Sequence, residues 1–100
     1  MHRETNQAGD TTRVSFTGVW TMDEFEPNKA LLEQLEGSGS KSVEYDLSGV
    51  PAIDSAGIGM LLLANDRLGK AGIDFRISGA QGAVAQIFDV AKIGDLVTLV

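Results

Sequence analysis

The chain has 100 residues, of which 43% are hydrophobic, so it suits one folded domain with a single core. Its formal net charge of −6 argues against nucleic acid and anionic membranes as direct partners. Because it contains no cysteine, it has no disulfide, no thiol nucleophile and no thiolate metal site. The longest apolar run, Met60 to Ala64, is too short for a membrane span, and the polar N-terminus lacks the apolar segment of a signal peptide. We therefore expect a cytoplasmic protein without direct membrane insertion.

The N-terminal segment predicts a flexible tail followed by a strand. Residues 1–12 are polar and lack apolar periodicity, so we expect the folded domain to cover residues 13–100. Val14 and Phe16 then alternate with polar residues, which predicts a first strand that ends near Trp20.

A helix is expected to follow, because Asp23 and Glu26 have the spacing of a capping box. Pro27 is compatible with this helix, since the N–H groups of a first helical turn have no intrahelical partner. Further elements are expected in chain order: a loop over 37–40, a strand over 43–47, a helix over about 56–70 that Gly72 ends, a strand over 73–77, a helix over 84–91 and a short closing segment over 96–100. Alternating strands and helices of this kind predict an α/β sheet with parallel pairs.

The segment Ile53-Asp54-Ser55-Ala56-Gly57-Ile58-Gly59 lies where the second predicted strand and its loop lead into the long helix. Ser55 is placed at the helix start, where free N–H groups and the helix dipole favour an anion such as a phosphate. A second interpretation is purely structural, because Asp and Ser are common helix caps. The two interpretations are compatible, since Asp54 can cap the helix while Ser55 is modified.

Gly57 and Gly59 are unusual at a helix start, because each glycine lowers helix stability by roughly 1 kcal/mol relative to alanine. One explanation is close packing of the helix against the sheet. The other is that bare backbone lets a kinase or a partner approach Ser55. The sequence leaves both open.

Nothing in the sequence predicts a catalytic site. The pair Gly57 and Gly59 lacks the third glycine of a dinucleotide fingerprint, since Leu62 stands there. The only histidine is His2, so a small hydrolase using Ser55 would have no credible base. The acidic residues at 23–26 are better explained by the helix dipole than by metal binding. We expect no enzyme activity, no metal and no cofactor.

The stretch Tyr45-Asp46-Leu47-Ser48, followed by the Ile53 to Gly59 motif, resembles the STAS domain family and, within it, the anti-sigma-factor antagonists of bacterial partner switching. The resemblance implies a small single α/β domain with a mixed β-sheet packed with about three to four helices. It also implies that Ser55 is the phosphorylated residue and that Asp54 belongs to the recognition motif. Ala56 replaces the second hydroxyl residue often seen in this motif. Asp46 is expected to hold the following loop by accepting backbone N–H groups.

The resemblance implies a signalling adaptor that acts in transcription regulation. The unphosphorylated form would bind an anti-sigma factor or a kinase-like ATPase regulator through residues 54–59, phosphorylation of Ser55 would release it, and a serine phosphatase would reset it. An alternative from the same family is a non-switching accessory subunit of a lipid-transport ABC system, which docks on the ATPase through a related motif. The Gly18 to Thr21 segment also resembles segments of such transporter-linked STAS proteins.

Overall fold

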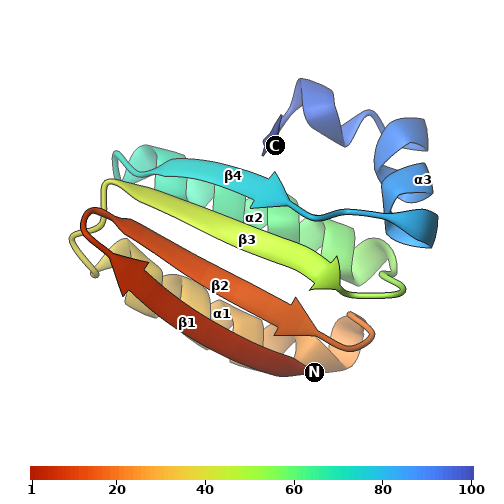
Figure 1. Ribbon diagram of the computed structural model, residues 1–100, viewed down its shortest axis with the longest axis horizontal. Helices are drawn as coiled ribbons and strands as arrows, with labels where there is room; N and C mark the ends of the chain where they lie inside the picture. The colour runs from red at the N-terminus through yellow and green to blue at the C-terminus, as the bar shows by residue number, and fades with distance from the viewer.

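The computed structural model describes all 100 residues, and it contains one five-stranded sheet and three α-helices (Figure 1). The elements are β1 (His2–Ala8), β2 (Thr11–Thr17), η1 (Met22–Glu24), α1 (Phe25–Glu36), β3 (Ser42–Gly49), α2 (Ser55–Lys70), β4 (Asp74–Ser78), α3 (Gly82–Val90), η2 (Ile93–Asp95) and β5 (Thr98–Leu99), where η1 and η2 are single turns of 3-10 helix. Strand order in the sheet is β1-β2-β3-β4-β5. Strand β1 is antiparallel to β2 and all other neighbours are parallel. The predicted α/β fold, a mixed sheet packed with about three to four helices, is therefore confirmed, with three α-helices.

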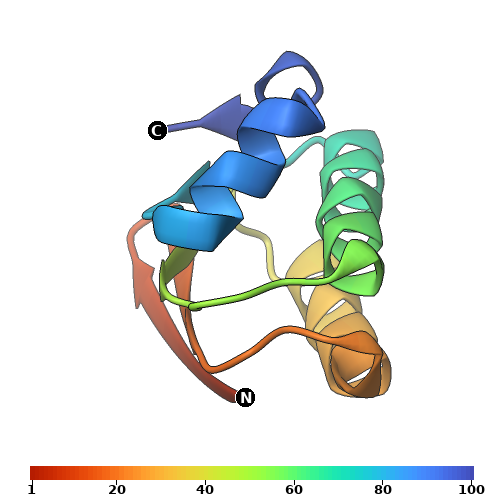
Figure 2. The same cartoon turned by 90° about the vertical axis from the view of Figure 1, so that its right-hand side faces the viewer.

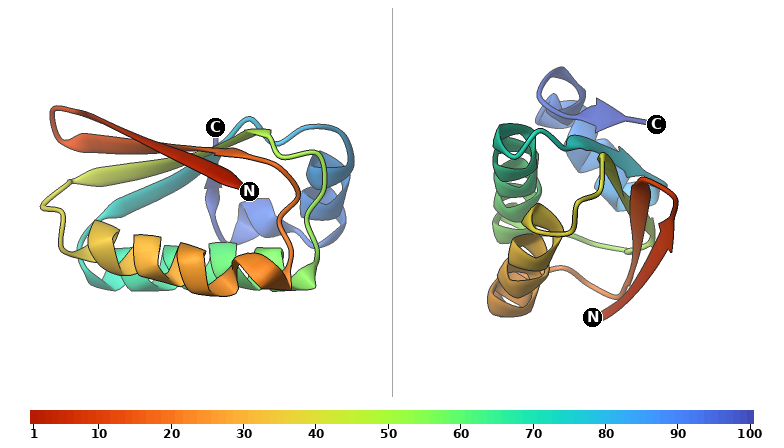
Figure 3. Two further views of the ribbon diagram at one scale, coloured as in Figure 1. Left: turned by 90° about the horizontal axis from the view of Figure 1, so that it is seen from below. Right: turned by 90° about the vertical axis from the view of Figure 1, so that its left-hand side faces the viewer.

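Helices α1 and α2 lie side by side on one face of the sheet (Figures 1 and 3). The strand residues that alternate toward these helices are apolar and almost fully buried, among them Val14, Tyr45 and Ile77. The opposite face carries the polar residues that alternate with these in β2 and β3, among them Arg13 and Glu44. No helix lies over this face (Figure 3). Helix α3 stands apart, beyond the carboxyl ends of β3 and β4 (Figures 1 and 2). The core therefore lies between one face of the sheet and helices α1 and α2, and Val84 and Phe88 of α3 extend it at the carboxyl end.

The segment predicted to be a flexible tail forms β1 instead. Residues His2 to Ala8 pair along their whole length with β2, and the two-residue turn contains Gly9 at φ 62°. In a two-residue hairpin turn whose first central residue has a positive φ, glycine is the favoured residue at that position. Arg3 donates to Asn28 on α1 and is ion-paired with Glu24, which ties the strand to that helix. The prediction was wrong because β1 is an exposed edge strand, so it shows no alternation of apolar and polar residues.

The predicted capping box is also absent. Helix α1 begins at Phe25 after the short turn η1, and neither of them has a side-chain cap hydrogen bond. Pro27 does fall in the first turn of α1, as expected. The local charge pattern therefore predicted the position of the helix correctly, but the side-chain capping hydrogen bonds that it also predicted do not form.

Helix α2 ends as the sequence predicts. Gly72 has φ 77° and donates its N–H to Gly69 O at 3.0 Å, while Ile73 donates to Leu68 O at 2.9 Å. These two hydrogen bonds form a Schellman motif, in which the residue after the glycine, Ile73, is apolar. It turns the chain directly into β4. No helix of the structure has both the length and the apolar character needed to cross a membrane.

Candidate functional site at the start of helix α2

Ser55 is the first residue of α2 and is exposed to solvent. Asp54 caps the helix: its backbone is extended and its Oδ1 accepts the Gly57 N–H at 3.0 Å. The N–H groups of Ser55 and Ala56 have no acceptor within the chain. The predicted compatibility therefore holds in geometry, because Asp54 performs the capping and the Ser55 hydroxyl is left free.

The loop before Ser55 is held by the segment that follows β2. The backbone N–H of Trp20 donates to the carbonyl oxygen of Ala52 at 3.0 Å. The carbonyl oxygen of Trp20 accepts a hydrogen bond from the backbone N–H of Asp54 at 3.1 Å. Gly18 donates to Gly49 O at 2.9 Å, which adds a third backbone bond between the two segments. Trp20 and Ile53 also form an isolated parallel bridge. These bonds fix where α2 begins, so Ser55 is presented on a rigid support.

Gly57 and Gly59 have different structural roles. A Cβ on Gly57 would lie 2.4 Å from Ile53 Cγ1 and 3.0 Å from Trp20 Cδ1, and both side chains are buried. A Cβ on Gly59 would meet nothing within 4 Å, and this residue is exposed. Close packing therefore accounts for Gly57, while bare accessible backbone remains an explanation for Gly59 alone.

The six residues predicted to contact a partner are not equally accessible. Asp54, Ser55 and Gly59 are exposed, and Ala56 and Ile58 are half-buried. Gly57 is buried, so it supports the surface from beneath. For Gly57 the explanation that bare backbone lets a partner approach Ser55 does not hold, because a side chain at this position would point into the core.

Two apolar residues near this surface were missed by the sequence analysis. Val19 is 51% exposed and Met22 is 72% exposed, on either side of the Trp20 segment that holds the loop. Met22 begins η1, which packs against α2. They belong to a connection with neither helical nor strand periodicity, so only their apolar character in a polar segment signals them. Exposed apolar side chains therefore flank Trp20, the residue whose backbone is bonded to the loop before Ser55.

Asp46 holds the end of β3, as predicted. Its Oδ1 accepts the Ser48 N–H at 3.0 Å and its Oδ2 accepts from Arg13 at 2.8 Å. Partial burial raises the pKa of the Asp46 carboxyl, but these hydrogen bonds and the Arg13 charge outweigh burial and hold the pKa below its ordinary value. Gln81 donates to Ser48 O at 2.9 Å from the start of α3. The loop that leads to Ser55 is thus fixed at both of its ends.

No general base accompanies Ser55. Its hydroxyl has no side-chain hydrogen bond within the chain, and no hydrogen bond joins it to His2, the only histidine. Nucleophilic catalysis needs a base within hydrogen-bond reach. The start of α2 therefore presents an exposed serine hydroxyl beside two backbone N–H groups that have no acceptor within the chain.

The chain is thus a small α/β domain in which the first residue of α2 is exposed to solvent. The chain matches the family model described as "Mlab, STAS domain" over residues 4–98. It therefore belongs to the STAS domain family, and the family assignment made from the motif is confirmed.

Solved structures with the same fold include anti-sigma factor antagonists. The antagonist from Mycobacterium paratuberculosis is 17% identical, with a TM-score of 0.87 over 98% of this chain and 83% of that chain. TM1081 from Thermotoga maritima is 14% identical, with a TM-score of 0.88 over 97% of this chain and 84% of that chain. SpoIIAA from Bacillus, solved in its phosphorylated form, is 13% identical, with a TM-score of 0.75 over 99% and 91%. No curated protein matches the chain. At these identities the structures establish the fold.

Proposed function

We propose that this protein is a phosphorylation-switched signalling adaptor of the cytoplasm. The unphosphorylated form binds an anti-sigma factor or a related kinase-like ATPase through the surface around Ser55, and phosphorylation of Ser55 releases it. The observation that carries the proposal is the free, exposed hydroxyl of Ser55 at a helix start whose cap is supplied by its neighbour Asp54. The phosphorylated form of the structurally similar SpoIIAA supports it.

The physical basis of release is a change of charge in a surface that a partner must desolvate. A phosphate adds about 1.5 to 2 negative charges and three strong acceptors. The N–H groups of Ser55 and Ala56 accommodate this group on the free protein, because they have no acceptor in the chain. Inside an interface fitted to a hydroxyl beside Val19 and Met22, the same group would be desolvated and poorly matched. A tenfold loss of affinity requires only about 1.4 kcal/mol.

The partner supplies the chemistry in this scheme. The kinase contributes ATP and metal, and a serine phosphatase resets the switch, so this chain needs no cofactor and no catalytic residues. Its output is the release of whatever the regulator holds, which in anti-sigma systems is a transcription factor.

A second function is favoured by the description of the matching family, which names an Mlab STAS domain. In that function the chain is a constitutive accessory subunit of a lipid-transport ABC system and docks on the ATPase through the same surface. Ser55 would then be a contact residue and would not be phosphorylated.

Identification of the partner separates the two functions. The full chain, tagged at its C-terminus, is purified from its native cells with bound proteins, and the Ser55→Trp variant serves as a control for binding through this surface. A histidine-kinase-like ATPase that phosphorylates the wild-type chain once, on the peptide containing Ser55, supports the switch. An ATPase and permease pair without phosphorylation supports the accessory subunit. Efficient phosphorylation of Ser55→Ala would contradict the assignment of the site.

A further inference from the structure

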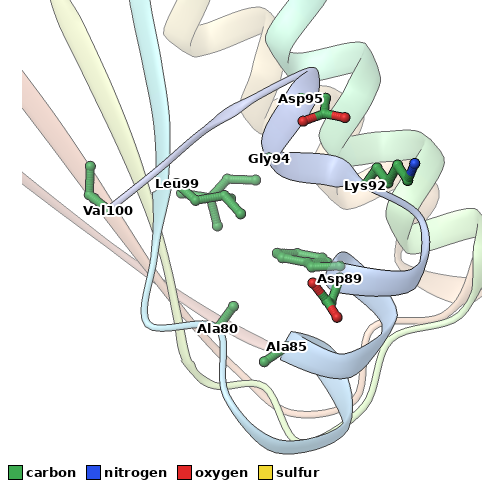
Figure 4. A pocket seen from close by; sticks show the side chains of 10 residues that line it. Ala80, Ala85, Asp89, Lys92, Gly94, Asp95, Leu99 and Val100 are labelled. Atoms are coloured by element: carbon green, nitrogen blue, oxygen red, sulfur yellow. The ribbon is translucent and has the colours of Figure 1, made fainter.

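An open cavity of about 520 Å³, lined by six hydrophobic residues among ten, lies between α3 and the carboxyl end of the sheet, at its β5 edge (Figure 4). Its volume is in the range of about 300–1,000 Å³ that is usual for binding pockets. Figure 4 shows Ala80, Ala85 and Leu99 directed toward one common space. The apolar lining consists of Ile77, Ala80, Ala85, Phe88, Leu99 and Val100. This cavity shares no residue with the surface around Ser55.

Exposed apolar residues line the cavity and lie close to it in the chain. Leu99 is 41% exposed and Val100 is 66% exposed, and Leu96 nearby is 59% exposed. Exposed apolar residues gathered in one part of a fold are a feature of interaction sites. The cavity therefore resembles an anchor pocket within a wider contact surface.

Three charged residues line the rim of the cavity. Asp89 and Asp95 line the cavity and neither is ion-paired, while Lys92 is the single basic residue of the lining and is also unpaired. In Figure 4 the Lys92 side chain extends away from the space between Leu99 and Ala85. The rim thus has an excess of one negative charge, which favours a basic partner.

Strand β5 lies at the edge of the sheet, where a further strand could pair with it. Val100 donates its N–H to Ile77 O on β4 at 2.9 Å, so the peptide groups of the preceding Leu99 point toward the unpaired edge. Leu99 pairs in register with Ile77, and both side chains line the cavity. The side chains of residues that are paired across adjacent strands point to the same face of the sheet. A residue added beside Leu99 would therefore place its side chain over the cavity.

We propose that the β5 edge and this cavity bind an extended peptide segment of a second protein partner. The segment has a large apolar residue that enters the cavity and a Lys or Arg two positions away on the same face, facing Asp89 or Asp95. A second copy of this chain fits less well, because the same acidic rims would be brought together. The site is independent of Ser55, so an adaptor would carry two separate binding surfaces.

Synthetic peptides test the proposal with uniformly ¹⁵N-labelled full-length protein. The probe is acetyl-Lys-Thr-Phe-Thr-Lys-amide, whose Phe and Lys side chains share one face of a strand. We expect amide shifts at Ala80, Ala85 and Leu99 and none at Ser55. Exchange of both Lys for Glu, N-methylation of the Phe amide, or exchange of Phe for Ser should each weaken binding about tenfold, since each removes one component of the recognition.

Charge reversal on the protein provides the matched control. Asp89→Lys should weaken binding of the Lys peptide about tenfold and improve binding of the Glu peptide. Glu33→Lys, at an exposed position of α1, should change neither. Circular dichroism establishes that both variants are folded. Equal binding of the Lys and Glu peptides, shifts centred on Ser55, no shifts at the solubility limit of the peptide, or self-association through β5 in its absence would each overturn the proposal.

Discussion

Single residues at the start of α2 determine how the candidate switch is presented. Asp54 caps the helix, Gly57 lets it approach the core, and Ser55 is left exposed between them. Residue identity in the motif therefore predicted the position of the hydroxyl correctly. It did not separate the two glycines, because their difference depends on Ile53 and Trp20, and the Trp20 contact comes from another part of the chain.

The two glycines give opposite predictions for stability. Gly57→Ala should destabilise the protein, because strain in a packed core of roughly 1–3 kcal/mol exceeds the gain in helix propensity of about 1 kcal/mol. Gly59→Ala should stabilise it by up to about 1 kcal/mol, since its Cβ position is open. Urea unfolding followed by fluorescence of Trp20, the single tryptophan, measures both. Equal effects of the two variants would contradict the packing explanation.

At the scale of elements, the cap of α2 is a second point of control. Asp54→Ala should lower the free energy of unfolding by about 1 kcal/mol, because the Gly57 N–H loses its acceptor. Asp54→Asn keeps a cap and serves as the control, with a smaller loss. Chemical denaturation of the two variants at neutral pH decides the matter, and identical losses would mean that capping is not what Asp54 contributes.

The end of β3 predicts a pH dependence. Because the pKa of folded Asp46 is lowered, its stabilising effect is present above the unfolded carboxyl pKa of about 3.9 and is lost as pH falls through the folded value. Asp46→Asn should therefore cost about 1 kcal/mol at pH 7 and progressively less below about pH 4. Glu33→Gln, on an exposed and unpaired residue, should show no such difference. A pH-independent cost of Asp46→Asn would contradict the ion-pair explanation.

Elements with strong apolar periodicity were predicted well from the sequence, and an element without it was missed. The core strands β3 and β4 and the long helix α2 show their buried positions directly. Strand β1 is polar on both faces, so only Gly9 followed by Asp10 signals its hairpin. The start of α1 was misassigned because a charge pattern alone does not show which hydrogen bonds form.

For the whole molecule, one core supports two surfaces at different places on the fold. The Ser55 surface is built from the start of α2 and the segment after β2, while the cavity at β5 is built from α3 and the sheet edge. Strand order and the placement of α3 depend on contacts between distant segments, so the sequence motif indicated the first surface and gave no sign of the second. A phosphate on Ser55 should leave the core intact, because it lies at an exposed helix start.

In the proposed switch, phosphorylation of Ser55 changes binding and leaves folding unaffected. Calorimetric titration of the purified partner ATPase with unphosphorylated protein, Ser55-phosphorylated protein and the Ser55→Asp variant, with melting temperatures measured on the same samples, tests it directly. We predict that affinity falls at least tenfold in both modified forms, about 1.4 kcal/mol or more, while the melting temperatures stay close to that of the unmodified protein. Unchanged affinity after phosphorylation, or a loss of affinity that accompanies unfolding, would contradict the account.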